Sequence, residues 1–191
     1  MKKVLAALLF VSTTTFASDY VNLSVDQKDK VNSQEVHQVN RINLGRKFDN
    51  GLVVEGRMED EKVDKGDGTQ KQEGLGQVKV SYDIATGTLV TPYVAAAVGH
   101  KNKATIDFNF WLAEVGAKVK LGDASLRYGF RRRTAFDNNT TNAYDTNEQT
   151  VALGYNLTKN DNISIAYKQE RNNDGVSSEY NTKGIYFTHS F

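Results

Sequence analysis

The sequence predicts an all-β protein, a transmembrane antiparallel up-and-down β-barrel of about ten strands. Three observations predict this fold class. The N-terminus has the features of a secretory signal, many short segments alternate between apolar and polar residues, and the last segment is an amphipathic strand that ends on an aromatic residue. That final strand sets Ile185, Phe187, His189 and Phe191 against Tyr186, Thr188 and Ser190. A soluble strand can alternate in the same way, so the N-terminus decides between the two environments.

The first seventeen residues are expected to be a signal peptide. Lys2 and Lys3 give a positive start, an apolar run follows, and small residues precede a cut after Ala17. The apolar run is shorter than the ~20 residues that a transmembrane helix needs. We therefore expect residues 1–17 to be removed and residues 18–191 to form a single barrel domain.

Composition agrees with export and excludes several function classes. The chain has no cysteine, so disulfides and cysteine-based metal sites are excluded. Without Lys2 and Lys3, 22 basic residues face 23 acidic ones, a net charge of −1. Nucleic-acid binders usually carry a strong basic excess, so no nucleic-acid partner is expected.

Ten segments have the length and alternation of barrel strands. A membrane-spanning strand needs ~9–11 residues, with apolar side chains on one face only. The predicted strands are Asp19–Lys28, Glu35–Phe48, Leu52–Lys62, Gly74–Ile84, Leu89–Lys101, Asp107–Leu121, Ala124–Thr134, Asn147–Leu157, Asn162–Arg171 and Asn181–Phe191. The segment Leu89–Lys101 is apolar on both faces, so its phase is undetermined.

The connections between these segments alternate between short and long. The tight ones are rich in Asn, Asp or Gly, as hairpin turns require: Asp49–Gly51, Ala85–Thr88, Gly122–Asp123 and Lys159–Asp161. The long ones are polar, which predicts periplasmic turns and extracellular loops in a bacterial outer membrane. A soluble β-sandwich or lipocalin-like barrel is the alternative, but its inward face would have to be apolar.

Aromatic residues are expected on or near the lipid-facing side, several of them close to strand ends where membrane girdles form. They are Tyr82, Tyr93, Trp111, Tyr128, Phe130, Tyr155, Tyr167, Phe187 and Phe191.

Two stretches resemble the oligogalacturonate-specific porins, the KdgM-like family. Arg41–Gly51, followed by Leu52–Glu55, resembles a strand, Asn-Gly turn and strand of that family. Leu126–Arg133 resembles its Leu-Arg-Tyr strand with trailing basic residues. The resemblance implies a narrow, monomeric channel that passes acidic oligosaccharides along basic tracks in the lumen. Members mostly have twelve strands, which is the alternative to ten here, and a ten-stranded version would have a tighter lumen.

The side chains expected in the lumen include nine cations that form a basic track. Guanidinium groups match carboxylates and phosphates in two-point contacts, so a row of them favours anions. The expected substrate or ion pathway consists of Arg41, Arg57, Lys79, Lys118, Lys120, Arg127, Arg131, Arg133 and Lys168. The track predicts a channel for small anionic solutes. The alternative is that Glu55, Glu59 and Glu114 pair with these cations and plug the lumen, giving a non-conducting structural or adhesion barrel.

Neither catalysis nor a cofactor is expected. The three histidines, His37, His100 and His189, follow no catalytic spacing and are expected to be solvated rim residues. Asp64–Gly68 superficially suggests a calcium loop but lacks the ligand spacing of an EF-hand. The expected partners are outer-membrane lipid and lipopolysaccharide, a small anionic solute or oligosaccharide, and the barrel-assembly machinery, which would recognise Phe191. A terminal aromatic of this kind resembles the assembly signal of bacterial outer-membrane barrels.

Overall fold

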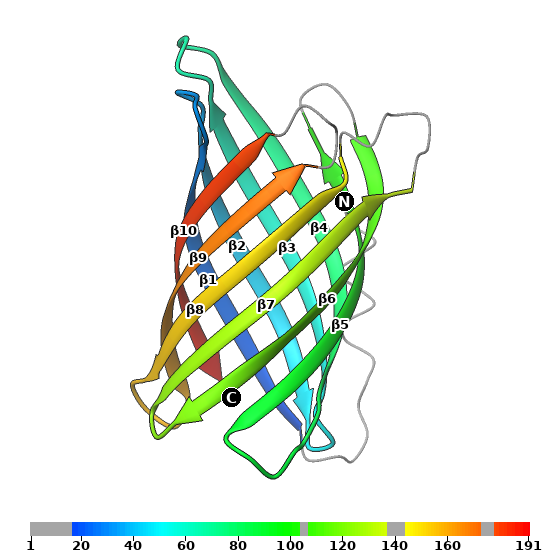
Figure 1. The fold of residues 1–191 in the computed structure, drawn as a ribbon, viewed down its shortest axis with the longest axis vertical. Helices are drawn as coiled ribbons and strands as arrows, with labels where there is room; N and C mark the ends of the chain where they lie inside the picture. Colours follow the sequence, from blue (N-terminus) through cyan, green and yellow to red (C-terminus); the bar gives the residue numbers. More distant parts are fainter. Residues whose placement is uncertain (1–16, 104–106, 137–143, 173–177) are drawn as a thin grey trace.

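The computed structural model describes residues 17–103, 107–136, 144–172 and 178–191. Ten antiparallel strands close into one barrel, in which each strand pairs with its neighbours in sequence and β1 pairs with β10 (Figure 1). The strands are β1 (Ala17–Lys30), β2 (Val36–Phe48), β3 (Leu52–Asp64), β4 (Gln70–Asp83), β5 (Val90–Asn102), β6 (Asp107–Leu121), β7 (Ala124–Ala135), β8 (Thr146–Asn156), β9 (Asp161–Asn172) and β10 (Glu179–Ser190). The prediction of a ten-stranded up-and-down barrel is confirmed, and the twelve-stranded alternative is wrong.

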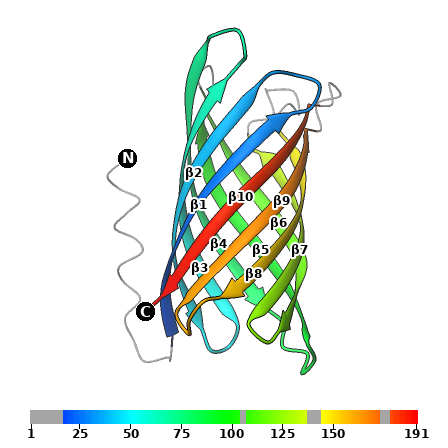
Figure 2. The ribbon, with the colours of Figure 1, turned by 90° about the vertical axis from the view of Figure 1, so that its left-hand side faces the viewer.

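Closure of the barrel depends on the pairing between the first and last strands. Tyr20 lies opposite Ser190 and Lys30 lies opposite Tyr180, so β1 and β10 pair along most of their length (Figure 2). The backbone N–H of Phe191 adds a 2.9 Å hydrogen bond to the carbonyl oxygen of Asp19. A closed ladder satisfies the backbone polar groups that an open edge would leave unpaired in lipid.

The expected signal peptide falls on residues 1–16, which lie outside the described residues, and on Ala17. Ala17 is the first residue of β1 and pairs with Phe48. Cleavage after Ala17 stays a prediction. No helix among the described residues has the length and apolar character needed to cross a membrane.

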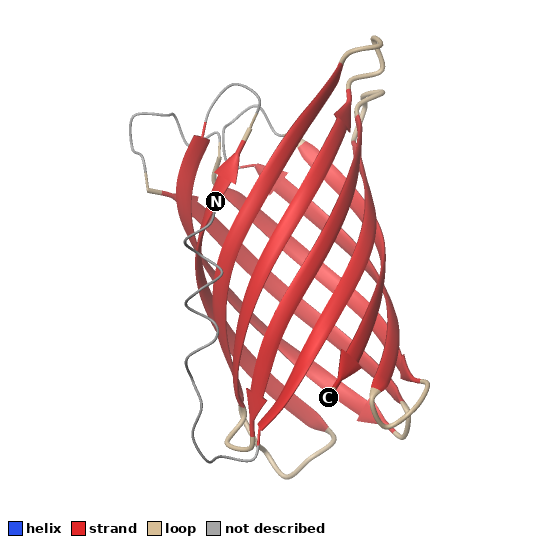
Figure 3. Cartoon of the chain, turned by 180° about the vertical axis from the view of Figure 1, so that it is seen from behind, coloured by secondary structure: helices blue, strands red, loops and turns tan. Residues whose placement is uncertain are grey.

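Side chains alternate between an apolar outer surface and a mainly polar lumen. On β6, Trp111 and Val115 are exposed on the outside, whereas Phe110 and Leu112 are buried inside. On β3, the outward side chains change from apolar at Met58 to charged at Asp60, toward the long connections. The strands run obliquely around the barrel, and the β3–β4 hairpin projects furthest at that end (Figures 1 and 3). The described long connections lie at one end and the short turns at the other, as the sequence predicts.

The structure settles the phase of β5 and corrects one aromatic assignment. Tyr93 is only 3% exposed and points into the lumen, so its predicted place on the lipid face is wrong. Its hydroxyl donates a 2.7 Å hydrogen bond to Glu114, which satisfies the polar end of the ring inside the barrel. Gly116 and Gly129 make room for it: a Cβ atom at either position would lie within 2.6 Å of the Tyr93 side chain.

A small apolar cluster occupies part of the lumen near the long connections. It consists of Ala97, Phe108, Phe110 and Leu112, with Leu75, Ala135 and Tyr144 packed against it. Alanines on β5 leave room for the large side chains that β6 directs inward. The cluster covers only one part of the wall, and the rest of the lumen carries charged side chains.

Candidate functional site

All nine cations of the predicted pathway lie on the inward phase of their strands. The inward phase is fixed by the buried residues that alternate with exposed apolar ones along each strand. The structure also brings carboxylates into the same space, so most of the nine cations form ion pairs there.

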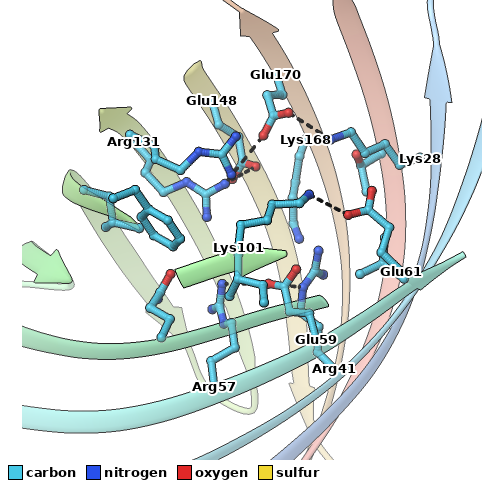
Figure 4. Close-up of a pocket in the computed structure, with 17 residues that line it drawn as sticks. Lys28, Arg41, Arg57, Glu59, Glu61, Lys101, Arg131, Glu148, Lys168 and Glu170 are labelled. Atoms are coloured by element: carbon cyan, nitrogen blue, oxygen red, sulfur yellow. Dashed lines mark hydrogen bonds and ion pairs between the residues drawn. The ribbon is translucent and has the colours of Figure 1, made fainter. Parts of the chain in front are cut away.

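Asp26 on β1 is the centre of one group of ion pairs. It has no exposed surface. Arg41 and Lys168 both contact its Oδ2 atom, with the Lys168 Nζ atom at 2.8 Å. Tyr186 donates a 3.0 Å hydrogen bond to the same oxygen. Arg41 also lies 2.8 Å from Glu59 (Figure 4). The ion pairs of Asp26 and Glu59 thus link β1, β2, β3 and β9 across the lumen.

Glu55 on β3 gathers a second group. Lys79 lies 3.2 Å from the carboxylate and Arg57 lies 3.5 Å from it. Tyr20 donates a 2.9 Å hydrogen bond to the other oxygen of Glu55. Arg57 also reaches Glu59 at 3.5 Å, so this group is continuous with the group around Asp26.

Two pairs lie nearer the short turns. Arg127 contacts Glu114 at 2.5 Å and donates a 2.9 Å hydrogen bond to the hydroxyl of Tyr93. Lys118 contacts Asp83 at 2.6 Å. Both cationic side chains are 39% exposed, so this end of the lumen is open to solvent.

A third group lies toward the long connections. Arg131 on β7 contacts Glu148 at 2.6 Å and approaches Glu170 at 3.9 Å. Glu170 in turn accepts a 2.8 Å hydrogen bond from Lys28. These side chains come from β1, β7, β8 and β9 and converge in the lumen (Figure 4). We call the ion pairs around Asp26, Glu55, Glu114 and Glu170 the luminal ion-pair network.

Two of the nine cations form no ion pair with a described carboxylate. Arg133 is 8% exposed and lies over the rings of Phe108 and Phe110, with centroid distances of 5.9 and 5.6 Å. No carboxylate of the described residues lies within 4.0 Å of it. Lys120 is exposed near the turn that joins β6 to β7 and likewise pairs with no described carboxylate.

Sequence reasoning missed three luminal residues that the structure brings together. Lys101 lies 2.6 Å from Glu61 and 3.4 Å from Glu73. His37 contacts Glu61 at 2.6 Å and Glu35 at 2.9 Å and is buried, so its prediction as a solvated rim residue is wrong. Lys28 lies two positions after Asp26, so the two side chains point to the same side of β1. This alternation is the sequence signal that could have placed Lys28 in the lumen. Lys101 required the phase of β5, which the sequence left open.

The network leaves little free volume in the middle of the barrel. The cavity lined by the central charged residues has a volume of about 40 Å³. This is room for a few water molecules, since one water needs roughly 10–15 Å³ on the same kind of measure. A wider cavity of about 210 Å³ lies toward the long connections. The expectation that paired side chains narrow the lumen therefore agrees with the structure.

Inward cations outnumber inward carboxylates among the described strand residues. The cations are Lys28, Lys30, Arg41, Lys47, Arg57, Lys71, Lys79, Lys101, Lys118, Lys120, Arg127, Arg131, Arg133 and Lys168. The carboxylates are Asp26, Glu55, Glu59, Glu61, Glu73, Asp83, Glu114, Glu148 and Glu170. The chain as a whole is close to neutral, so its positive charge is concentrated in the lumen. Among the described residues, no group of three or more His, Asp or Glu side chains is arranged to hold a metal ion.

Comparison with known proteins identifies the fold. No family model matches the sequence, and no curated protein sequence is significantly similar. Among solved structures, the COG4313 outer membrane channel from Pseudomonas putida F1 is 9% identical, with 94% of this chain and 97% of that chain covered and a TM-score of 0.61. A KdgM porin in complex with disordered oligogalacturonate is 11% identical, with 90% and 99% covered and a TM-score of 0.54. The β-domain of the Bordetella autotransporter BrkA is 8% identical, with 92% and 99% covered and a TM-score of 0.50.

These similarities concern the fold, which channels and an autotransporter domain share. Membership of the KdgM-like family stays a prediction. The closed barrel and its outward apolar surface are typical of bacterial outer-membrane proteins, and the structural neighbours are proteins of this kind. The predicted fold class and location are therefore confirmed: the chain is an outer-membrane β-barrel.

Proposed function

We propose that this barrel is a narrow outer-membrane channel that admits small anionic solutes. The observation that carries the proposal is the excess of inward cations over inward carboxylates in a chain that is otherwise nearly neutral. Fixed positive charge on a low-dielectric wall attracts anions and repels cations.

Cations that pair with no described carboxylate lie near the two ends of the lumen. Arg133 faces the wider cavity near the long connections, and Lys120 is exposed near the short turns. Arg127 and Lys118 are partly exposed as well. An anion entering from either side therefore meets cations before it reaches the paired charges in the middle.

The narrow middle limits the size of the solute. A cavity of about 40 Å³ is too small for a sugar ring, so an acidic oligosaccharide would pass only if the ion pairs separated. The geometry thus favours small inorganic or organic anions over the oligosaccharides that the family resemblance implies.

The second candidate is a non-conducting structural or adhesion barrel. The continuity of the ion pairs from Asp26 through Glu59 to Glu55 favours it, because a lumen filled by paired side chains can be closed throughout. Under this alternative the charges would stabilise the barrel and conduct nothing.

Solute flux into liposomes distinguishes the two. Folded protein is reconstituted, and swelling is measured in isosmotic potassium salts of formate, acetate, galacturonate and trigalacturonate. Valinomycin carries the potassium counter-ion, and protein-free liposomes give the background flux. The channel predicts swelling with formate and acetate, little with galacturonate and none with the trisaccharide. No flux of any anion, with folding verified by heat-modifiable migration on a gel, would support the closed barrel. Rapid flux of the trisaccharide would show that the central ion pairs do not limit the lumen.

A further inference from the structure

The cavity toward the long connections, which we call the outer vestibule, has features of a binding site in its own right. It has a volume of about 210 Å³ and is partly open to solvent. Its lining includes Lys71, Lys103, Arg133, Tyr144 and Tyr180. Lys71, Arg133 and Tyr180 lie near the ends of β4, β7 and β10. Lys103 directly follows β5, and Tyr144 shortly precedes β8.

The carboxylates of the vestibule are already paired. Glu61 contacts His37 and Lys101, each at 2.6 Å, and Glu73 lies 3.4 Å from Lys101. Glu170 contacts Lys28 at 2.8 Å. Glu35, the fourth carboxylate of the cavity, lies 2.9 Å from His37 and 3.7 Å from Lys30. Each of these carboxylates therefore already has a partner, and the six Lys and Arg side chains that line the cavity outnumber its four carboxylates.

Four cations of the same cavity pair with none of the described carboxylates. They are Lys65, Lys71, Lys103 and Arg133. Like charges held in one cavity repel each other, and an anion placed among them would relieve that repulsion. The positive surroundings also affect Lys103. Burial, and then repulsion by Lys101, lower its pKa to about 8.

Arg133 is the most constrained of the four. Its guanidinium lies over Phe108 and Phe110, and Phe108 stacks on Tyr144 with ring centroids 4.7 Å apart. The side chain is more than nine-tenths buried, and its Nε atom has no hydrogen-bond partner among the described residues. Buried polar groups are normally hydrogen-bonded, so this arginine keeps donor capacity that none of the described residues uses.

We propose that the outer vestibule binds a small multivalent oxyanion of the phosphate or phosphomonoester class, held by Arg133, Lys103 and Lys71. A guanidinium supplies forked donors to two oxygens, and the two lysines supply point charges around them. A monocarboxylate carries one negative charge and two oxygens, and it matches several uncompensated cations less well than a dianion does.

This proposal deepens the proposed function, because it names a ligand class for the outer mouth of the channel and rests on the same excess of positive charge. Binding in detergent solution does not require conduction, so the two proposals fail separately. Saturable phosphate binding by a barrel without conductance would refute the channel alone. Conductance without phosphate binding would refute the vestibule site alone.

The test is a calorimetric titration of folded, detergent-solubilised protein with inorganic phosphate at constant ionic strength. We expect saturable binding, weakened roughly tenfold by Arg133→Gln, since a hydrogen bond to a charged group contributes about that much. Lys71→Gln removes a cation near the start of β4 that pairs with no described carboxylate, and it should also weaken binding. Lys62→Gln, an exposed outward lysine on β3, is the matched control and should bind as the native protein does.

Three results would overturn the site. They are the absence of saturable binding, an affinity that neither Arg133→Gln nor Lys71→Gln changes, and acetate binding as tightly as phosphate does. If Arg133→Gln fails to fold, Lys71→Gln and Lys103→Gln decide the question with the same titration.

Discussion

Lys168 on β9 donates a 2.8 Å hydrogen bond to Asp26 on β1, although 142 positions separate the two residues in the sequence. The strand between them, β10, places inward Gly184 beside Asp26, where a Cβ atom would lie 1.9 Å from the carboxylate. The absence of a side chain at Gly184 thus lets the pair form across β10. This pair joins the first strand to the last hairpin from inside the barrel.

Breaking this pair should destabilise the barrel. In Asp26→Asn, Lys168 and Arg41 lose a carboxylate that is fully buried, and removal of one member of a buried pair costs about 3 kcal/mol. The free energy of unfolding is measured in detergent micelles by urea titration. Asp19→Asn is the control, because its pair with Arg46 lies on the exposed surface and should contribute nothing measurable. Equal losses in the two variants would refute a stabilising role for the luminal pair.

Replacing one ion pair by two neutral glutamines should widen the lumen without changing its net charge, because glutamine is shorter than the arginine it replaces. In the double variant Arg131→Gln and Glu148→Gln, the 2.6 Å contact between the two groups is lost, and neither partner is left as an unpaired charge. We expect single-channel conductance to rise about twofold or more while the anion preference remains. Either single change alone should destabilise the barrel more than the double change does. An unchanged conductance would mean that this pair does not narrow the channel.

The terminal aromatic is expected to direct assembly. Phe191 is 76% exposed and caps the end of β10, with its ring 4.8 Å from that of His189. It adds little to the packing of the folded barrel, so its deletion should lower the yield of inserted protein more than the stability of what is inserted. Fractionation of the outer membrane measures yield, and Phe191→Tyr should restore it. A normal folded yield after deletion would contradict an assembly role.

Anion binding in the outer vestibule should weaken as the pH rises. The pKa of Lys103 is lowered to about 8, by burial first and then by Lys101, while Glu73 acts in the opposite direction and Arg133 and Lys28 add to the lowering. Lys103 therefore loses its charge as the pH rises through this value, and the site becomes less positive. A phosphomonoester is a dianion throughout the range from about pH 7.5 to 9.5, so the ligand itself does not change. The affinity should fall severalfold over that range in the native protein and stay level in Lys103→Gln. A level profile in both proteins would exclude Lys103 from the site.

The sequence predicts the fold well because the information is local. Each strand can be recognised from the alternation within its own sequence, such as that of Leu126, Tyr128 and Phe130 on β7. Each short turn contains its own Asn, Asp or Gly. The phase of β5 is the exception. Ala95, Ala96 and Ala97 give both faces the same character, and only the neighbouring Glu114 and the two glycines decide that Tyr93 points inward.

The candidate site was less accessible to sequence reasoning. Parity places Arg41, Arg127 and Arg133 in the lumen, yet it does not state which carboxylate each one meets. Pairing depends on the stagger and tilt of strands that are not adjacent, as between Lys101 and Glu61, 40 positions apart. The alternation of side chains also ends where the strands end. It therefore could not indicate that Lys65 and Lys103 line the outer vestibule.

The most direct test of the channel is the reversal potential of the native protein in a planar bilayer with a KCl gradient. For a narrow anion channel we expect small, discrete conductance steps and a reversal potential whose sign reports chloride passing more readily than potassium. Arg133→Gln should lower this preference and leave the barrel folded, because no described carboxylate depends on Arg133 for a partner. Folded protein that conducts nothing, or that prefers potassium, would contradict the account.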